Sequence, residues 1–354
     1  MAPTLSRAPD EKINWITSLP FLLFHLVPLL ALVTGVTTKA LILAGVLYAV
    51  RMFAITAGYH RYFAHRSYKA SRAVQFVMAF VGTTAAQKGP LWWAGHHRAH
   101  HRYADTERDI HSPQRGFWWS HAGWILCDKY NKTDLSSVRD LAAYPELRFL
   151  DRFNMIGPVC LGALAFAIGG WSGLVVGFFA STVTLWHATF TINSRSHTLG
   201  TRRYATTDTS RNNPVLAVIT FGEGWHNNHH HYQASARQGF FWWECDLSWY
   251  ALRVLRRLHI VRDLREPTPV ALAADRIRDG AFDLGMFVAA WRRAGVAVNR
   301  SRAELALSVG AHQAAVEAAL HDKRAALQAA VNASLKSAED LTRTAKRAAR
   351  GLPV

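Results

Sequence analysis

The stretch ALILAGVLYAVRMFAITAGYHRYFAH, residues 40–65, decides how this chain folds. Residues 40–57 contain Arg51 as their only charged group, and two histidines, His60 and His65, follow directly. A helix needs about 20 mainly apolar residues to cross the hydrocarbon core of a bilayer. The stretch therefore predicts a membrane crossing that delivers a pair of imidazoles to one face of the membrane.

Three further apolar runs are also long enough to cross a bilayer. The first contains His25 as its only ionisable group, and a Gly169-Gly170 pair separates the other two. We therefore expect an all-α integral membrane protein with four transmembrane helices in two hairpins. The expected crossings are residues 15–36, 40–57, 153–171 and 172–192.

The distribution of Lys and Arg predicts the orientation. The turn at 36–39 has only Lys39, and the turn at 169–172 has no basic residue, whereas 58–152 is rich in both. Because basic loops stay on the cytoplasmic side, residues 58–152 and everything after 193 should be cytosolic. Both termini are then cytosolic, and the Arg- and Ala-rich composition favours a bacterial inner membrane.

The remaining segments complete the domain plan. Residues 1–14 form a cytosolic N-terminus, and 15–300 form the membrane domain with a cytosolic helical cap. An apolar segment over 73–94 contains Gln87 and Lys88, and we expect an interfacial helix there. Residues 301–354 should be a basic, Ala-rich helical tail with a narrow apolar stripe.

The net charge and the cysteines exclude few classes of function by themselves. The net charge of +17 is compatible with nucleic acid, anionic lipid or a phosphorylated ligand, and the apolar runs favour lipid over nucleic acid. The three cysteines are far apart, so they predict neither a disulfide framework nor a thiolate metal site.

Histidine clusters carry the chemistry. The chain has 18 histidines, and nine of them fall in four short clusters on the side predicted to be cytosolic. Residues three and four apart share one helix face, so each cluster can aim two or three nitrogens at one point. The candidate metal ligands are His60, His65, His97, His100, His101, Asn193, His197, His226, His229 and His230.

Nine imidazoles exceed the four ligands that one zinc ion takes, which predicts two ions with four or five ligands each. Imidazole alone does not choose between Zn, Cu, Fe and Ni. A site beside lipid meets acyl chains with no acidic proton, so attack on their C–H bonds needs a redox metal and O2. Two iron ions satisfy this requirement, whereas zinc has no redox chemistry.

These clusters resemble those of the membrane acyl-CoA delta-9 desaturases, the family of stearoyl-CoA desaturases. The family strings H-R-x-x-x-H, H-R-A-H-H, N-S-x-x-H and G-E-G-x-H-N-x-H-H match residues beginning at His60, His97, Asn193 and Gly222. The resemblance covers about residues 15–265. It implies a di-iron enzyme that uses O2 to place a cis double bond in a long-chain acyl-CoA.

The resemblance also implies a bent acyl tunnel. Tyr48 and Met52 would close its far end, and Lys129 would contact the acyl carrier, although Asp128 stands where a second basic residue is expected. No haem-binding segment is evident, so a separate donor is expected, such as a cytochrome b5-like protein, a ferredoxin or a flavoprotein reductase. The other tunnel residues would be Gln87, Trp93, Thr189 and Phe190, the last in place of the family's usual Trp.

Three alternatives remain open on the sequence. A related di-iron membrane hydroxylase would insert oxygen instead of forming an alkene. The acyl chain could also be carried by a phospholipid or a carrier protein rather than by CoA. A membrane metal-binding or transport protein is the non-enzymatic alternative, but its ligands would be expected within the crossings.

Overall fold

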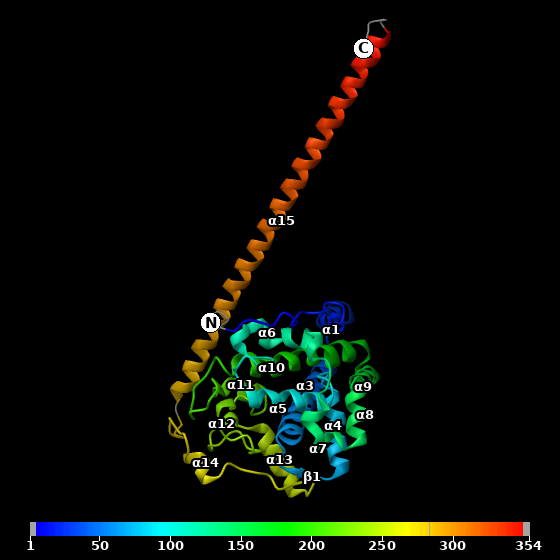
Figure 1. Cartoon of the computed structure of the whole chain (residues 1–354). Helices are drawn as coiled ribbons and strands as arrows, with labels where there is room; N and C mark the ends of the chain where they lie inside the picture. Colours follow the sequence, from blue (N-terminus) through cyan, green and yellow to red (C-terminus); the bar gives the residue numbers. More distant parts are fainter. Residues whose placement is uncertain (1–4, 283, 350–354) are drawn as a thin grey trace. The chain divides into compact units, whose positions relative to one another are not determined.

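A computed structural model describes residues 5–282 and 284–349 of the chain, and helices make up most of it (Figure 1). The expected helical class is therefore correct. The chain divides into two compact units between Trp291 and Arg292, about ten residues before the expected start of the tail.

Two helical segments are long and apolar enough to cross a membrane. The first joins α3 (Thr38–Phe53) to the π-helical η2 (Ala54–Ala64), and Thr37 caps its N-terminus by accepting a hydrogen bond from the backbone of Ala40. The second comprises α9 (Ile156–Ser172), the π-helical η7 (Gly173–Ala180) and α10 (Ser181–Arg195). These segments include the expected crossings 40–57 and 172–192 and most of 153–171, but two such segments do not confirm the expected four crossings.

The second segment turns back on itself at Gly170, which has a positive φ of 58°. A Cβ placed on Gly162 would lie 3.5 Å from the ring of Phe178, although 16 residues of straight helix would separate the two by about 24 Å. α9 therefore packs antiparallel against η7, and the glycine pair makes the expected hairpin.

The first apolar run differs from expectation. Residues 15–36 contain no single long helix, and the run consists of α1 (Leu19–Leu26), the 3-10 turn η1 (Val27–Leu30) and α2 (Ala31–Thr34). Pro28 lacks a backbone N–H and interrupts the α-helical ladder at this point. Leu32 and Val33 are 90% and 86% exposed, and such a large apolar surface marks a contact with lipid or another protein.

The expected helix over 73–94 is also interrupted. α4 (Arg72–Thr83) and α5 (Pro90–Tyr103) are separate helices. Between them Ala86 and Lys88 adopt positive φ values of 54° and 67°, which no α-helix accommodates. α5 starts afresh at Pro90, because proline suits the first helical turn.

The remaining elements form a cap of short helices. Strands β1 (Lys69–Ala70) and β2 (Val261–Arg262) pair antiparallel. The other elements of this unit are η3 (Pro113–Arg115), α6 (Phe117–His121), η4 (Gly123–Leu126), η5 (Asp128–Tyr130), η6 (Leu135–Val138), α7 (Arg139–Ala142), α8 (Pro145–Arg152), α11 (Pro214–Ile219), α12 (His226–His231), α13 (Leu247–Arg257) and α14 (Pro269–Ala273).

Buried charge ties η2 to the cap. The Arg61 guanidinium is buried and donates to Asp246 at 2.9 Å and to Glu223 at 3.1 Å. Removing one member of a buried pair leaves an uncompensated charge, so this triad fixes the end of the first long segment against residues 160 to 190 positions later.

The described part of the second unit lies within α15 (Leu284–Ala349), a helix of 66 residues that begins before the expected boundary at 301. Its predicted apolar stripe is present and exposed. Val316, Leu320, Leu327 and Val331 lie on it.

Candidate metal centre

Nine of the ten predicted ligands, all of them histidines, gather in two groups. In each group the ring nitrogens lie within 4.8 Å of one another. We name them centre A (His60, His65, His97, His101 and His229) and centre B (His100, His197, His226 and His230).

The π-helix η2 explains how His60 and His65 reach the same centre. They are five residues apart and would diverge on an α-helix. In the structure the backbone N–H of His65 bonds the carbonyl of His60 at 3.1 Å, an i→i+5 bond typical of a π-turn. The two ring centroids lie 4.8 Å apart as a result.

The spacing predicted that each three-histidine cluster would aim its nitrogens at one point, and this prediction is wrong. On α5, His97 and His101 belong to centre A while His100 belongs to centre B. On α12, His229 belongs to centre A, and His226 and His230 to centre B. Each helix therefore bridges both centres and holds them side by side.

In both centres the ring nitrogens that face one another are Nε2 nitrogens. The Nε2 pairs His60–His229, His65–His97 and His101–His229 of centre A are separated by 3.0, 2.9 and 2.9 Å. In centre B, His197 Nε2 and His226 Nε2 are 3.1 Å apart. Two nitrogens at such a separation can both lie about 2.1 Å from one ion, the usual metal–imidazole distance.

The protonation states favour bound cations. Burial, followed by repulsion from neighbouring imidazoles, holds the pKa values of His65, His97, His101, His226 and His229 well below their usual range. These rings are neutral at pH 7 and present lone pairs to one another. His230 Nε2 is buried without a hydrogen-bond partner. The donor set therefore fits one metal ion in each centre.

Carboxylates hold the outward nitrogens of four ligands. His100, His197 and His230 place Nδ1 at 3.1, 3.0 and 2.6 Å from Asp109, Asp105 and Asp208, and His60 Nδ1 contacts Glu223. A carboxylate on Nδ1 fixes the tautomer that leaves Nε2 free for a metal.

These carboxylates are ionised. Burial alone would raise the pKa of Asp105, but the hydrogen bonds from His197 and Thr209 lower it to about 2. The sequence analysis did not assign any of the four to the centre. The available signal was an acid a few residues from a cluster, as in Asp105 and Asp109 after His101 and Glu223 before His226.

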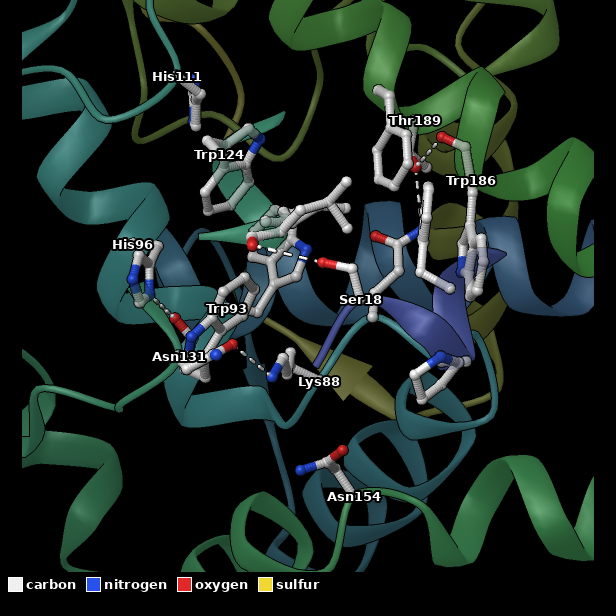
Figure 2. A pocket seen from close by; sticks show the side chains of 18 of the residues that line it. Ser18, Lys88, Trp93, His96, His111, Trp124, Asn131, Asn154, Trp186 and Thr189 are labelled. Carbon is white, nitrogen blue, oxygen red and sulfur yellow. Dashed lines mark hydrogen bonds between the residues drawn. The ribbon is translucent and has the colours of Figure 1, made fainter. Parts of the chain in front are cut away.

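A cavity of about 360 Å³ has Trp93, Trp186 and Thr189 in its wall, and these residues are labelled in Figure 2. Its wall includes the centre A ligand His97, and the ring of Trp93 stacks on His97 at 4.8 Å. Gln87 donates to Thr189 across the break before α5 at 2.9 Å. Four predicted tunnel residues line this cavity: Gln87, Trp93, Thr189 and Phe190.

Of the four other predicted residues, one lines the same cavity and three do not. Asn193 lines the same cavity from α10. Met52 is fully buried in the main apolar core, and Tyr48 donates to the carbonyl of Ile219 at 2.6 Å; neither lines the cavity. Lys129 forms an ion pair with Asp10 at 2.8 Å.

Comparison with known proteins identifies the class. A family model described as fatty acid desaturase matches residues 37–270, which include every candidate ligand. The chain is 37% identical over 265 residues to an sn-1 stearoyl-lipid 9-desaturase of Anabaena variabilis, covering 74% of this chain and 97% of that protein. It is 34% identical over 274 residues to an sn-2 palmitoyl-lipid 9-desaturase of Nostoc, covering 76% of this chain and 95% of the relative. An icosanoyl-CoA 5-desaturase of Limnanthes douglasii is 39% identical over 226 residues, covering 62% of this chain and 63% of the relative.

The fold, the two histidine centres and these relatives define a membrane-type oxidoreductase that acts on fatty acyl chains. The chain belongs to the fatty acid desaturase family.

Proposed function

We propose that this protein is an O2-dependent di-iron desaturase that places a cis double bond at the delta-9 position of a long acyl chain. The observation that carries the proposal is the cavity wall shared between Trp93, Thr189 and the centre A ligand His97. An acyl chain in this cavity would run past centre A, whereas a transport site would lie within the crossings.

The nine histidines would hold two iron ions, with Asn193 as a tenth ligand or a partner of bound water. Iron supplies the one-electron oxidation that C–H cleavage needs. The reaction balances as two adjacent methylenes, O2, two electrons and two protons giving one alkene and two waters. A separate electron-donor protein provides the electrons, and the basic cytosolic face would dock an acidic donor.

The protein's own residues position the substrate. Apolar rings of Phe21, Phe24, Trp186 and Phe190 line the cavity and exclude water from the chain. The Gln87–Thr189 hydrogen bond fixes two walls relative to each other. Because the methylenes are chemically alike, this positioning selects which carbons react.

We propose a membrane-lipid ester as the acyl carrier ahead of CoA. The relatives that match over 97% and 95% of their length are named for stearoyl-lipid and palmitoyl-lipid substrates. Lys129, the predicted carrier contact, is engaged by Asp10 and lies 4.0 Å from Glu11. A role for Lys129 with CoA would require this pair to open.

The proposed topology has four crossings with both termini in the cytosol of a bacterial inner membrane. The apolar exposed surface of α1 and α2 and the hairpin at Gly170 support it. Labelling by a membrane-impermeant reagent of single cysteines at residue 37, in the first external turn, and at residue 256, near the end of α13, tests it, because both positions are exposed. Residue 37 should react from outside the cell and residue 256 from the cytosolic side.

Expression in a host that lacks unsaturated acyl chains tests the function. Mass spectrometry should find acyl chains lighter by two hydrogens, with the double bond at carbon 9, and the purified protein should contain two iron ions. His229→Ala, in centre A, should abolish the product. A product heavier by one oxygen would instead identify a hydroxylase. Parallel assays with stearoyl-CoA and with stearoyl-lipid vesicles identify the carrier.

A further inference from the structure

The cavity beside His97 has one lysine in its wall. Among the described residues that line this cavity, Lys88 is the only lysine, arginine, aspartate or glutamate. It lies in the break between α4 and α5, and its Nζ donates to Asn131 Oδ1 at 3.1 Å (Figure 2). Gln87, directly before it, bonds Thr189 instead, and Figure 2 shows Lys88 and Asn131 apart from Thr189. Two consecutive side chains therefore contact different walls of the cavity.

The backbone at Lys88 has a conformation that glycine adopts more easily. Its φ is 67°, in the left-handed region where a Cβ lies too close to the following carbonyl oxygen. Such a conformation costs free energy in a residue other than glycine, and it occurs often at functional sites. Because the backbone alone would favour glycine here, the lysine side chain needs an explanation of its own.

The Lys88 ammonium has donors to spare. It has three N–H groups, and the described residues offer it one acceptor, Asn131 Oδ1. Asp151 and Asp128 are near enough for their charges to act on Lys88, but both bind other groups. Asp151 accepts from two backbone N–H groups at the start of α5 at 2.9 and 3.0 Å, and Asp128 accepts from Asn131 at 2.9 Å.

Burial makes an anionic ligand favourable at this position. Lys88 is half-buried, and its Nζ lies 5.9 Å from the centre of the Trp92 ring. Burial lowers the pKa of Lys88, although the charges of Asp151 and Asp128 oppose the shift. An anion that donates no hydrogen bond but accepts two would stabilise the charged form of the lysine.

The rest of the wall indicates what kind of anion fits. Most of the cavity is lined by aromatic and aliphatic side chains, which suit an acyl chain. In the proposed reaction the acyl carboxyl is bound in an ester or thioester and has no charge. The anionic group must then belong to the acyl carrier, and phosphate is the anion that phospholipids and CoA share.

We propose that Lys88 binds a phosphate of the acyl carrier, so that the enzyme selects phosphorylated carriers over neutral glycolipids. The inference rests on the proposed function, because it assumes an acyl ester in the cavity. The two Nζ–H groups that Asn131 leaves free donate to phosphate oxygens in charge-assisted hydrogen bonds. Lys129, the carrier contact expected from the sequence, pairs with Asp10 and does not line the cavity. Lys88 takes the role expected of it.

Lipid binding to the metal-free, full-length protein tests the site without turnover. Native mass spectrometry compares distearoyl phosphatidylglycerol with monogalactosyl distearoylglycerol, which has the same chains and no phosphate. Lys88→Gln should reduce the preference for the phospholipid about 10- to 100-fold, whereas Lys88→Arg should retain it. Lys69→Gln, which removes an exposed lysine of β1, is the control and should leave the preference unchanged. An equal preference in wild type and Lys88→Gln would overturn the proposal.

Lys88→Gly separates ligand binding from folding. Glycine accepts the positive φ without strain, so the Tm should equal or exceed that of wild type. The preference for phospholipid should nevertheless fall as far as in Lys88→Gln. A glycine variant that keeps the wild-type preference would assign Lys88 to packing and contradict a phosphate site.

Turnover of the iron-loaded enzyme identifies the source of the phosphate. The three substrates are stearoyl phosphatidylglycerol vesicles, stearoyl-CoA and stearoyl galactolipid vesicles. Lys88→Gln should raise KM for the phosphorylated carrier about 10- to 100-fold, change kcat less, and leave the galactolipid reaction unchanged. An effect on the phospholipid identifies a membrane phosphate, and an effect confined to stearoyl-CoA identifies the CoA phosphates. Equal effects on all three substrates, or none, would refute phosphate recognition.

The outcomes separate this inference from the proposed function. If iron-loaded wild type makes no alkene from any of the three substrates, the proposed function fails, and the binding preference still decides the role of Lys88. If alkene forms and Lys88→Gln binds and reacts as wild type does, the proposed function stands and the inference about Lys88 is wrong.

Discussion

At the scale of single residues, the carboxylates behind the ligands decide how firmly a metal is held. Asp208 accepts from His230 Nδ1 at 2.6 Å and is itself fixed by the backbone N–H of Ser210 at 2.9 Å. The hydrogen bond from His230 keeps the pKa of Asp208 far below its usual range despite burial. Its charge raises the basicity of the ligand ring.

Asp208→Asn should therefore weaken iron binding without unfolding the protein. An amide still accepts from Nδ1 but lacks the charge, and loss of such a partner reduces metal affinity about 10- to 100-fold. Competition with a chelator measures the affinity. Asp263→Asn, which removes an exposed partner of Lys69, is the control and should leave iron binding unchanged. Equal affinities for Asp208→Asn and wild type would contradict a supporting role for Asp208.

At the scale of elements, the break between α4 and α5 and its contact with α10 shape the cavity. Gln87 lies in this break and bonds Thr189 on α10 at 2.9 Å, and Trp93 follows on the first turns of α5. One hydrogen bond thus connects two walls of the cavity near centre A.

Thr189→Val should loosen this connection with almost no change in side-chain volume. We expect a lower yield and double bonds at positions beside carbon 9, because the chain can slide by one or two methylenes. The unpaired Gln87 amide should reduce stability by about 1–3 kcal/mol. Gas chromatography with mass spectrometry locates the bonds. Thr184→Val, an exposed threonine on the same helix, is the control, and an unchanged product would refute this positioning role.

At the scale of the whole molecule, all described site residues lie in the first compact unit. The family match ends at residue 270, and the second unit starts at Arg292. A protein truncated after Trp291 should therefore retain iron content and turnover within about twofold of the full chain. Loss of iron on truncation would mean that α15 contributes to the centre. Normal iron with lost turnover would assign α15 to substrate or donor delivery.

Acid should destabilise the metal-free protein through its clustered histidines. Burial lowers the pKa of His230 to about 4 and holds the pKa values of five other ligands well below their usual range, whereas the unfolded chain titrates near 6.5. Below about pH 6.5 the unfolded state therefore binds more protons than the folded state, so the stability that these neutral rings contribute is complete above that pH and falls as pH decreases. His100 opposes the trend, because Asp109 raises its pKa despite burial.

Thermal unfolding of metal-free protein at neutral pH and at about pH 5 checks this sign. We expect the lower Tm at pH 5, and bound iron should reduce the difference because a ligated nitrogen cannot take up a proton. A metal-free Tm that is equal or higher at pH 5 would show that the histidines are already protonated or exposed in the folded state.

The sequence by itself determined the helical class, the apolar segments, the hairpin glycine and the nine histidines. Helical periodicity and apolar length act over a few residues, so local sequence carries them. Pro28 and the residues around Lys88 also act locally, and they interrupt helices that hydropathy alone predicts as continuous. Their backbone preferences, rather than their polarity, end the hydrogen-bond ladder.

Only the tertiary structure decided which histidines share a centre. The π-helix η2 aligns His60 with His65, and α5 and α12 each divide their ligands between centres A and B. The carboxylate partners join residues up to 163 positions apart, such as His60 and Glu223. Such pairings depend on how distant segments pack, and no local spacing encodes that geometry.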